Sequence, residues 1–82
     1  MYQRIDEKIE VAGVYYQGKF KPKRFKWQSR IFDIGEITLT NDVRDGGRKL
    51  RYYSVMVKGT AYRLCFDRDN EQWLLEEVWY EG

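Results

Sequence analysis

Residues 37–58, ITLTNDVRDGGRKLRYYSVMVK, decide the fold class. Near their centre, Asp45-Gly46-Gly47 supplies the positive φ angles that a tight hairpin turn demands. The residues that follow this turn have the two-residue period of a strand, which places Tyr53, Val55 and Val57 on one face. The segment therefore predicts a β-hairpin with one apolar and one polar face.

The same pattern recurs on both sides of this hairpin. Short alternating segments, separated by Gly, Pro and polar turns, predict further strands at residues 8–17, 24–28, 30–40, 61–66 and 72–80. The apolar phase slips at Gly13 and at Gly35, so we expect a β-bulge or a sharp bend at each. A tight turn is expected near Gln28-Ser29. Residues 1–7 are predicted to be a frayed end or a short turn of helix, and residues 18–22 a loop.

No segment has apolar residues at the spacing of an amphipathic helix over three turns, so we expect no substantial helix. Three Trp, seven Tyr and four Phe supply the large side chains that a core in so short a chain requires. The sequence predicts one all-β domain over residues 1–82. We expect a small antiparallel meander of about six strands, folded as a strongly bent sheet or a partly open barrel.

The compartment is inferred from cysteine usage and hydropathy. The single cysteine, Cys65, cannot form an intramolecular disulfide, which is typical of a reducing compartment. It alternates with Leu64 and Phe66 and is expected to act as a small buried hydrophobe. No segment approaches the ~18 apolar residues of a membrane span, and residues 1–10 lack the apolar core of a signal peptide. We therefore expect a cytoplasmic bacterial protein without membrane association.

The residue types that most enzymes depend on are scarce. The chain has no histidine and one cysteine, so neither an ordinary zinc site nor a Ser-His or Cys-His nucleophile can form within it. The acidic run at 67–71 lacks the later Gly and Glu of an EF-hand loop, which favours a hairpin turn. Glu76 and Glu77 are adjacent in a predicted strand and are not expected to share a site. We predict a non-catalytic protein without metal or cofactor.

Six basic residues and no acidic residue lie between Gln17 and Arg30. With one aromatic residue among them they form the candidate nucleic-acid-binding set: Lys19, Phe20, Lys21, Lys23, Arg24, Lys26 and Arg30. Small β-barrels that bind single-stranded nucleic acid combine a positive groove with aromatic platforms. Alternation directs Phe25 and Trp27 into the core, whereas Phe20, in a Lys-rich loop beside Pro22, is expected to be exposed and to stack. The alternative is that the lysines only keep a sheet edge soluble.

The charge is distributed unevenly along the chain. Residues 67–82 hold six acidic side chains, opposed by Arg68 alone. The alternative function is therefore a protein-interaction module, or a homodimer that uses a sheet edge or pairs the basic and acidic ends.

Residues 25–34, FKWQSRIFDI, resemble a motif in a family of small bacterial proteins of unknown function. The motif is Phe-x-Trp-x-x-Arg-x-aromatic-x-Val/Ile after a Pro, and Pro22 fills that place. Tyr62-Arg63-Leu64 and Trp73-Leu74-Leu75 are similar to two further strands of the family, so the resemblance covers roughly residues 9–80. Ser29 stands where the family often has Gly. Some members are encoded near accessory DNA polymerases of damage tolerance, which implies a link to DNA repair.

Overall fold

The computed structural model describes residues 1–80, which form an all-β fold of seven antiparallel strands. The strands are β1 (Tyr2–Tyr16), β2 (Lys19–Trp27), β3 (Arg30–Asp33), β4 (Glu36–Asp45), β5 (Arg48–Val57), β6 (Thr60–Asp67) and β7 (Gln72–Trp79). The predicted fold class is confirmed. There is one strand more than expected because the predicted strand at 30–40 divides into β3 and β4. None of the described residues forms a helix long and apolar enough to cross a membrane.

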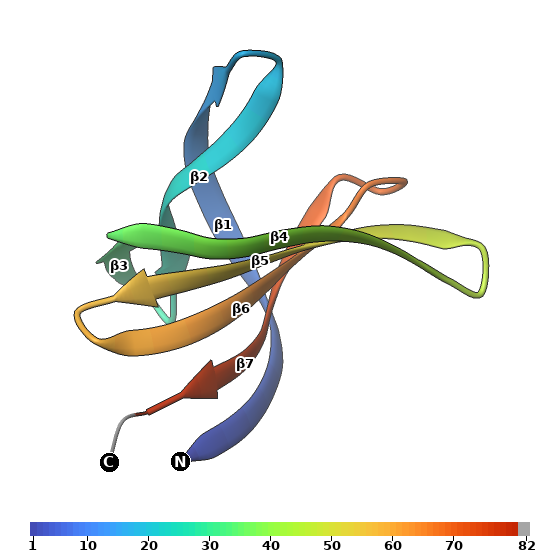
Figure 1. Ribbon diagram of the computed structural model, residues 1–82. Helices are drawn as coiled ribbons and strands as arrows, with labels where there is room; N and C mark the ends of the chain where they lie inside the picture. Colours follow the sequence, from blue (N-terminus) through green and yellow to red (C-terminus); the bar gives the residue numbers. More distant parts are fainter. Residues whose placement is uncertain (81–82) are drawn as a thin grey trace.

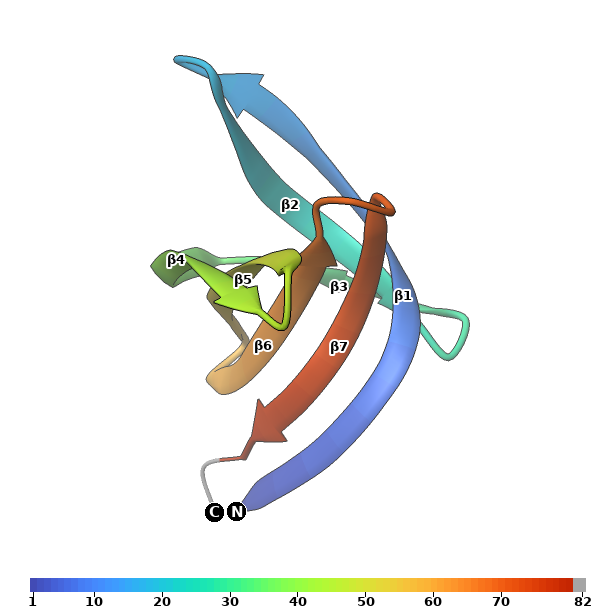
Figure 2. The same ribbon diagram turned by 90° about the vertical axis from the view of Figure 1, so that its right-hand side faces the viewer.

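The strands form one sheet in the order β3-β2-β1-β7-β6-β5-β4. Strand β1, the third in this order, changes partner along its length: it pairs with β7 as far as Ile9 and with β2 from Glu10 onward. As a result, the β1–β2 hairpin stands across the strands β4 to β7 and projects beyond them (Figure 1). The view in Figure 2 shows how strongly the sheet curls. The predicted bent sheet or partly open barrel is therefore what the chain forms.

A second crossing between the two parts of the sheet lies at Ile34-Gly35. β3 and β4 are consecutive in the chain but lie at opposite edges of the sheet, so the chain passes directly from one edge to the other. The antiparallel pairings require these two strands to run in the same direction. Ile34 N–H donates to the carbonyl oxygen of Lys23 at 2.9 Å, and Gly35 N–H donates to that of Met56 at 2.8 Å. The bend predicted at Gly35 is confirmed, and these two bonds draw the edges together at this end of the barrel.

Two-residue turns with positive φ at both positions join most of the paired strands. They lie at Gln17-Gly18, Gln28-Ser29, Gly46-Gly47 and Lys58-Gly59. This geometry matches the right-handed twist of the flanking strands. The turn predicted at Gln28-Ser29 is confirmed. In the hairpin that decides the fold class, both positive φ angles belong to glycines, and Asp45 ends β4 opposite Arg48.

The expected loop at 18–22 and the expected frayed end at 1–7 are both wrong. Most of the first seven residues belong to β1 and pair with β7, with an irregular register near Asp6, whose φ is 54°. The turn at Gln17-Gly18 is so tight that residues 19–22 already belong to β2. Gly18 and Pro22 predicted a loop from the local sequence, but residues 19–22 pair with β1 instead.

The register shift expected at Gly13 is present, but the extra residue lies on the opposite strand. Ala12 pairs with Arg24 and Gly13 pairs with Pro22, which leaves Lys23 as the bulged residue of β2. Because β1 itself contains no extra residue here, its side chains keep strict alternation to its C-terminal end.

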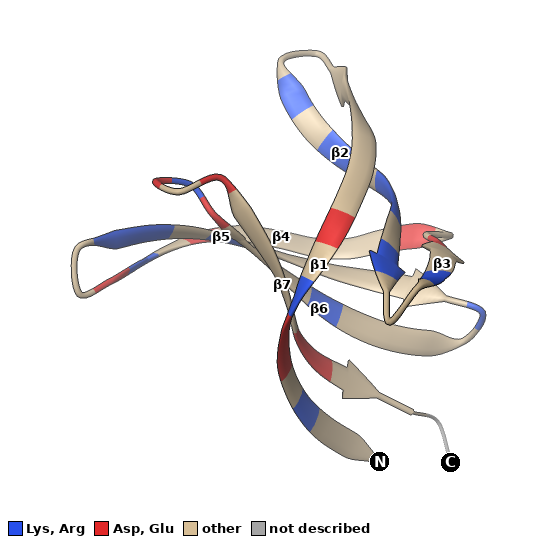
Figure 3. Cartoon of the chain, turned by 180° about the vertical axis from the view of Figure 1, so that it is seen from behind, with Lys and Arg blue, Asp and Glu red and all other residues tan. Residues whose placement is uncertain are grey.

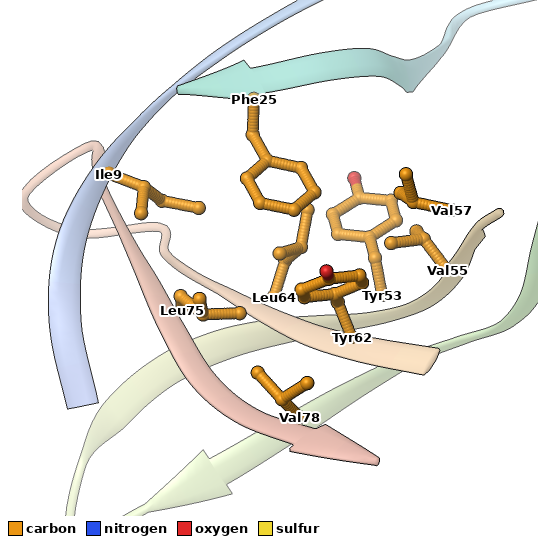
Figure 4. Close-up of a cluster of buried hydrophobic side chains, with 9 residues drawn as sticks. All are labelled: Ile9, Phe25, Tyr53, Val55, Val57, Tyr62, Leu64, Leu75 and Val78. Carbon is orange, nitrogen blue, oxygen red and sulfur yellow. The ribbon is translucent and has the colours of Figure 1, made fainter. Parts of the chain in front are cut away.

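The core lies between the two parts of the curled sheet (Figure 4). It consists of Ile9, Phe25, Tyr53, Val55, Val57, Tyr62, Leu64, Leu75 and Val78. Phe25 reaches in from β2, stacks on Phe32 with ring centroids 4.9 Å apart, and meets Tyr62 edge-on at 5.3 Å. Burying a side chain of this size stabilises the fold by roughly 1.5–3 kcal/mol. Tyr80, placed in the last strand by the sequence, lies beyond β7 and is exposed.

Gly13→Ala should destabilise the hairpin. A Cβ at this position would lie 2.2 Å from the carbonyl oxygen of Lys21 and 2.7 Å from the ring of Phe20. The backbone contact cannot relax without opening the bulge, so we expect a loss of about 1–3 kcal/mol in the free energy of unfolding, measured with urea. Gly35→Ala is the control, because its Cβ would meet only the Met56 carbonyl, at 3.5 Å. Equal losses in the two variants would contradict this account.

Ser29→Gly should stabilise the protein. Ser29 has a φ of 62°, a conformation that costs an L-residue roughly 1–2 kcal/mol. Glycine removes that cost but loses more entropy on folding, so the expected net gain is about 0.5–1 kcal/mol. Urea unfolding of the variant should show a higher midpoint at unchanged slope. Gly59→Ala, at φ 82°, should shift the midpoint the other way.

Candidate nucleic-acid interface

The β1–β2 hairpin has two distinct faces. Opposed residues share a face, and β1 keeps its alternation past the bulge. The outer face of β1 therefore carries Val14 and Tyr16, which lie opposite Lys21 and Lys19 respectively. Tyr16 is 58% exposed, so an aromatic ring lies beside the lysines on the outside of the hairpin.

All six predicted cationic residues are exposed. Four of them follow the outer face of β2: Lys19, Lys21, Arg24 and Lys26. Lys23 is the exposed bulge residue between them, and Figure 3 shows basic residues recurring along β2. Arg30 is different, because it pairs with Trp27 on the inner face and places its guanidinium 5.6 Å from the ring centre of Phe32. The structure thus brings five of the six cations into one row.

The lysines of this row are free of internal charge pairing. Arg24 forms an ion pair with Asp33 at 3.0 Å. Among residues 1–80, no carboxylate lies within 4.0 Å of the side-chain nitrogens of the four lysines, Lys19, Lys21, Lys23 and Lys26. Four positive charges therefore remain available to an anionic ligand.

The predicted exposure of Phe20 is wrong. Its ring is partly buried on the inner face, 5.3 Å from the ring centre of Tyr15 and 5.8 Å from that of Trp73. The exposed aromatic residues of the hairpin are instead Tyr15, at 79%, and Tyr16. Sequence reasoning missed Tyr16 because it assigned the bulge to β1, which places Val14 and Tyr16 on the apolar face. Strict alternation from Ile9 onward would have found Tyr16.

An open cleft of about 700 Å³ adjoins the inner face of the hairpin, where β2 and β4 diverge. Residues 18–21 line one side, and the facing side is formed by Ile37, Thr40, Asn41, Asp42, Arg51 and Tyr53. Arg51 donates two hydrogen bonds to the Asp42 carboxylate, at 2.6 and 3.1 Å. These bonds hold the pKa of Asp42 below its usual value, so this carboxylate and its guanidinium partner form a neutral pair.

The carboxylates near the C-terminus are arranged differently from the expectation. Glu76 is an extra residue in β7, so it and Glu77 both reach Arg63, at 3.5 and 3.8 Å. The prediction that they do not share a site is wrong because a bulge breaks the alternation. Among the described residues no cluster of three or more potential metal ligands occurs. Cys65 is buried as predicted, and burial raises the pKa of its thiol.

The acidic run that begins at Asp67 forms a turn, as predicted. Asp67 Oδ1 accepts hydrogen bonds from the backbone N–H groups of Asp69 and Asn70, at 3.0 and 3.2 Å. This is the local bonding by which Asp stabilises turns.

Comparison with protein-family models, curated proteins and solved structures finds no match to this chain. The resemblance around residues 25–34 therefore stays a prediction, and the interface is argued from its geometry alone.

Alkaline pH should destabilise the fold in part through Tyr52. Burial, with Cys65 and Glu76 nearby, raises the pKa of Tyr52 to about 12. The ordinary value is about 10, so this group stabilises the fold below pH ~10, and the contribution is lost as the pH rises through ~12. The free energy of unfolding, measured between about pH 9 and pH 11.5, should fall less steeply in Tyr52→Phe than in the wild type. Parallel curves would contradict this assignment.

Proposed function

We propose that this domain is a non-catalytic nucleic-acid-binding module that uses the row of cations along β2. The observation that carries the proposal is the absence, among the described residues, of carboxylates paired with Lys19, Lys21, Lys23 and Lys26. Alternate residues of a strand are about 6.6 Å apart, so the row offers several closely spaced charges to a phosphate backbone. The sequence resemblance adds a role in DNA repair in a bacterium, and the cysteine usage and hydropathy add a cytoplasmic location.

The acidic residues of the C-terminal third give little competition for this row. Asp67 and Asp69 accept hydrogen bonds within their own turn or from Lys49 N–H, and Glu76 and Glu77 contact Arg63. Glu81 lies outside the described residues. Arginines of the same chain thus partly neutralise Asp67, Glu76 and Glu77, whereas no ion pair among residues 1–80 neutralises the lysines of β2.

Charge reversal should abolish binding. A labelled oligonucleotide is titrated with the wild type and with the triple variant Lys21→Glu, Lys23→Glu, Lys26→Glu. Four phosphate contacts predict that the wild-type affinity falls about 50-fold between about 50 and 200 mM salt. The triple variant should show no binding at the lower salt concentration.

The matched control is Arg44→Glu, Lys49→Glu, Lys58→Glu, which makes the same charge change at exposed positions away from β2. It should keep most of the affinity, because its charges lie outside the row. Loss of binding in the control to the same degree, or no wild-type binding at low salt, would refute the proposal.

A second candidate function is a protein interaction through a sheet edge, with a partner or a second copy. The observation that favours it is that β4 pairs only with β5 among the described strands, so its ten residues present a free edge. Free edges are templates for pairing with another chain. Sedimentation equilibrium separates the candidates, because a dimer that persists at high salt supports edge pairing and a monomer supports the nucleic-acid proposal.

A further inference from the structure

We infer that the ligand of the hairpin is single-stranded, and that one of its bases stacks on Tyr15, whose ring packs against Phe20, a residue that lines the cleft between β2 and β4. This inference rests on the proposed function and names the substrate class and the base-contacting residue. The observations that support it concern the inner face of the hairpin, whereas the proposed function is based on the lysines of the outer face.

Tyr15 has the features of a stacking platform. Its side chain is 79% exposed, so burial does not explain an aromatic residue at this position. Its ring is nevertheless held in place, because it meets Phe20 edge-on at 5.3 Å and Phe20 in turn packs 5.8 Å from Trp73. Because the contact with Phe20 fixes the orientation of the exposed Tyr15 ring, that ring loses little conformational freedom when a base stacks on it.

Two residues are shared between the row of cations, which would bind the phosphate backbone of the ligand, and the lining of the cleft. Lys19 and Lys21 belong both to the outer row and to the lining of the cleft. The lysine row therefore adjoins a space of about 700 Å³, within the ~300–1,000 Å³ range of ligand pockets. Across the cleft, Thr40, which lies opposite the buried Tyr53, presents a hydroxyl group that can donate to or accept from the edge of a base.

The edge of β2 that faces the cleft disfavours an extended peptide as the occupant. β3 pairs only with Arg24 to Trp27 of β2, so residues 19–22 have no strand on that side. Pro22 lacks an N–H group to donate to a ladder, and lysines at an edge discourage strand addition. The same lysines attract a phosphate backbone, so charge complementarity selects nucleic acid over a peptide.

Single-strandedness follows from the geometry of stacking. In a duplex both faces of every base are covered by neighbouring bases, and a base reaches an aromatic platform only after it leaves the stack. A single strand has no such cost, and every base has a face that can stack. Stacking on Tyr15 would therefore favour single strands, whereas the lysine row alone would bind either form.

The test compares three labelled probes, namely a single-stranded oligothymidine, the same strand in a duplex with oligoadenine, and an abasic strand of equal length. Each is titrated with the wild type, Tyr15→Ala, Tyr15→Trp and the control Tyr80→Ala, which removes an exposed ring elsewhere. Tyr15 is exposed enough that its loss should not unfold the protein, and circular dichroism verifies this.

The expected result is that the wild type binds the single strand at least tenfold more tightly than the duplex or the abasic strand. Tyr15→Ala should lose about tenfold in affinity for the single strand alone. Tyr15→Trp and Tyr80→Ala should keep it.

Equal wild-type affinity for single strand and duplex, unchanged in Tyr15→Ala but abolished by charge reversal on β2, would overturn the inference and leave the proposed function standing. Failure to bind any probe at low salt would overturn both. Capture of an extended peptide in the cleft, with no oligonucleotide bound, would likewise exclude a base as the occupant.

Discussion

The change of partner within β1 is the constraint on which the rest of the structure depends. One strand pairs with β7 up to Ile9 and with β2 from Glu10, so it holds the two parts of the sheet at an angle. Because of that angle, Phe25 of β2 reaches Tyr62 of β6, and an aromatic core forms across the fold. In a chain of this length no other layer is available to cover the apolar face of the sheet.

The barrel is joined at one end and open at the other. Two backbone hydrogen bonds at Ile34-Gly35 link the chain to β2 on one side and to β5 on the other. Beyond this crossing β2 and β4 separate, because β2 follows the hairpin and β4 follows β5. The cleft and the free edges are consequences of this one-sided closure, and they place lysines and an exposed tyrosine side by side.

The two interpretations of the basic segment share one physical origin. Lysines and Pro22 protect an edge from pairing with another strand, and the same lysines concentrate positive charge along β2. A binding surface differs from a protected edge in the side chains that lie near the charges. Here Tyr16 lies exposed beside Lys19 and Tyr15 lies exposed on the other face of the hairpin, and protection of an edge does not require aromatic rings in water.

The sequence by itself determined the fold class, the turns at Gln28-Ser29 and near Gly46, the bend at Gly35, and most of the apolar core. These features depend on two-residue alternation and on positive φ angles, which are properties of neighbouring residues. The cationic residues and their exposure could also be read from the chain, because alternation fixes which side chains face water.

Only the tertiary structure decided which strand carries the extra residue opposite Gly13, and this choice reversed the faces assigned to the aromatic residues of the hairpin. It also decided that most of the first seven residues belong to a strand paired with β7, that Glu76 and Glu77 meet at Arg63, and that β2 and β4 enclose a cleft. A bulge depends on the register of two strands, and a cleft depends on where edges part. Neither is visible in a single segment, because both arise from pairing between residues distant in the chain.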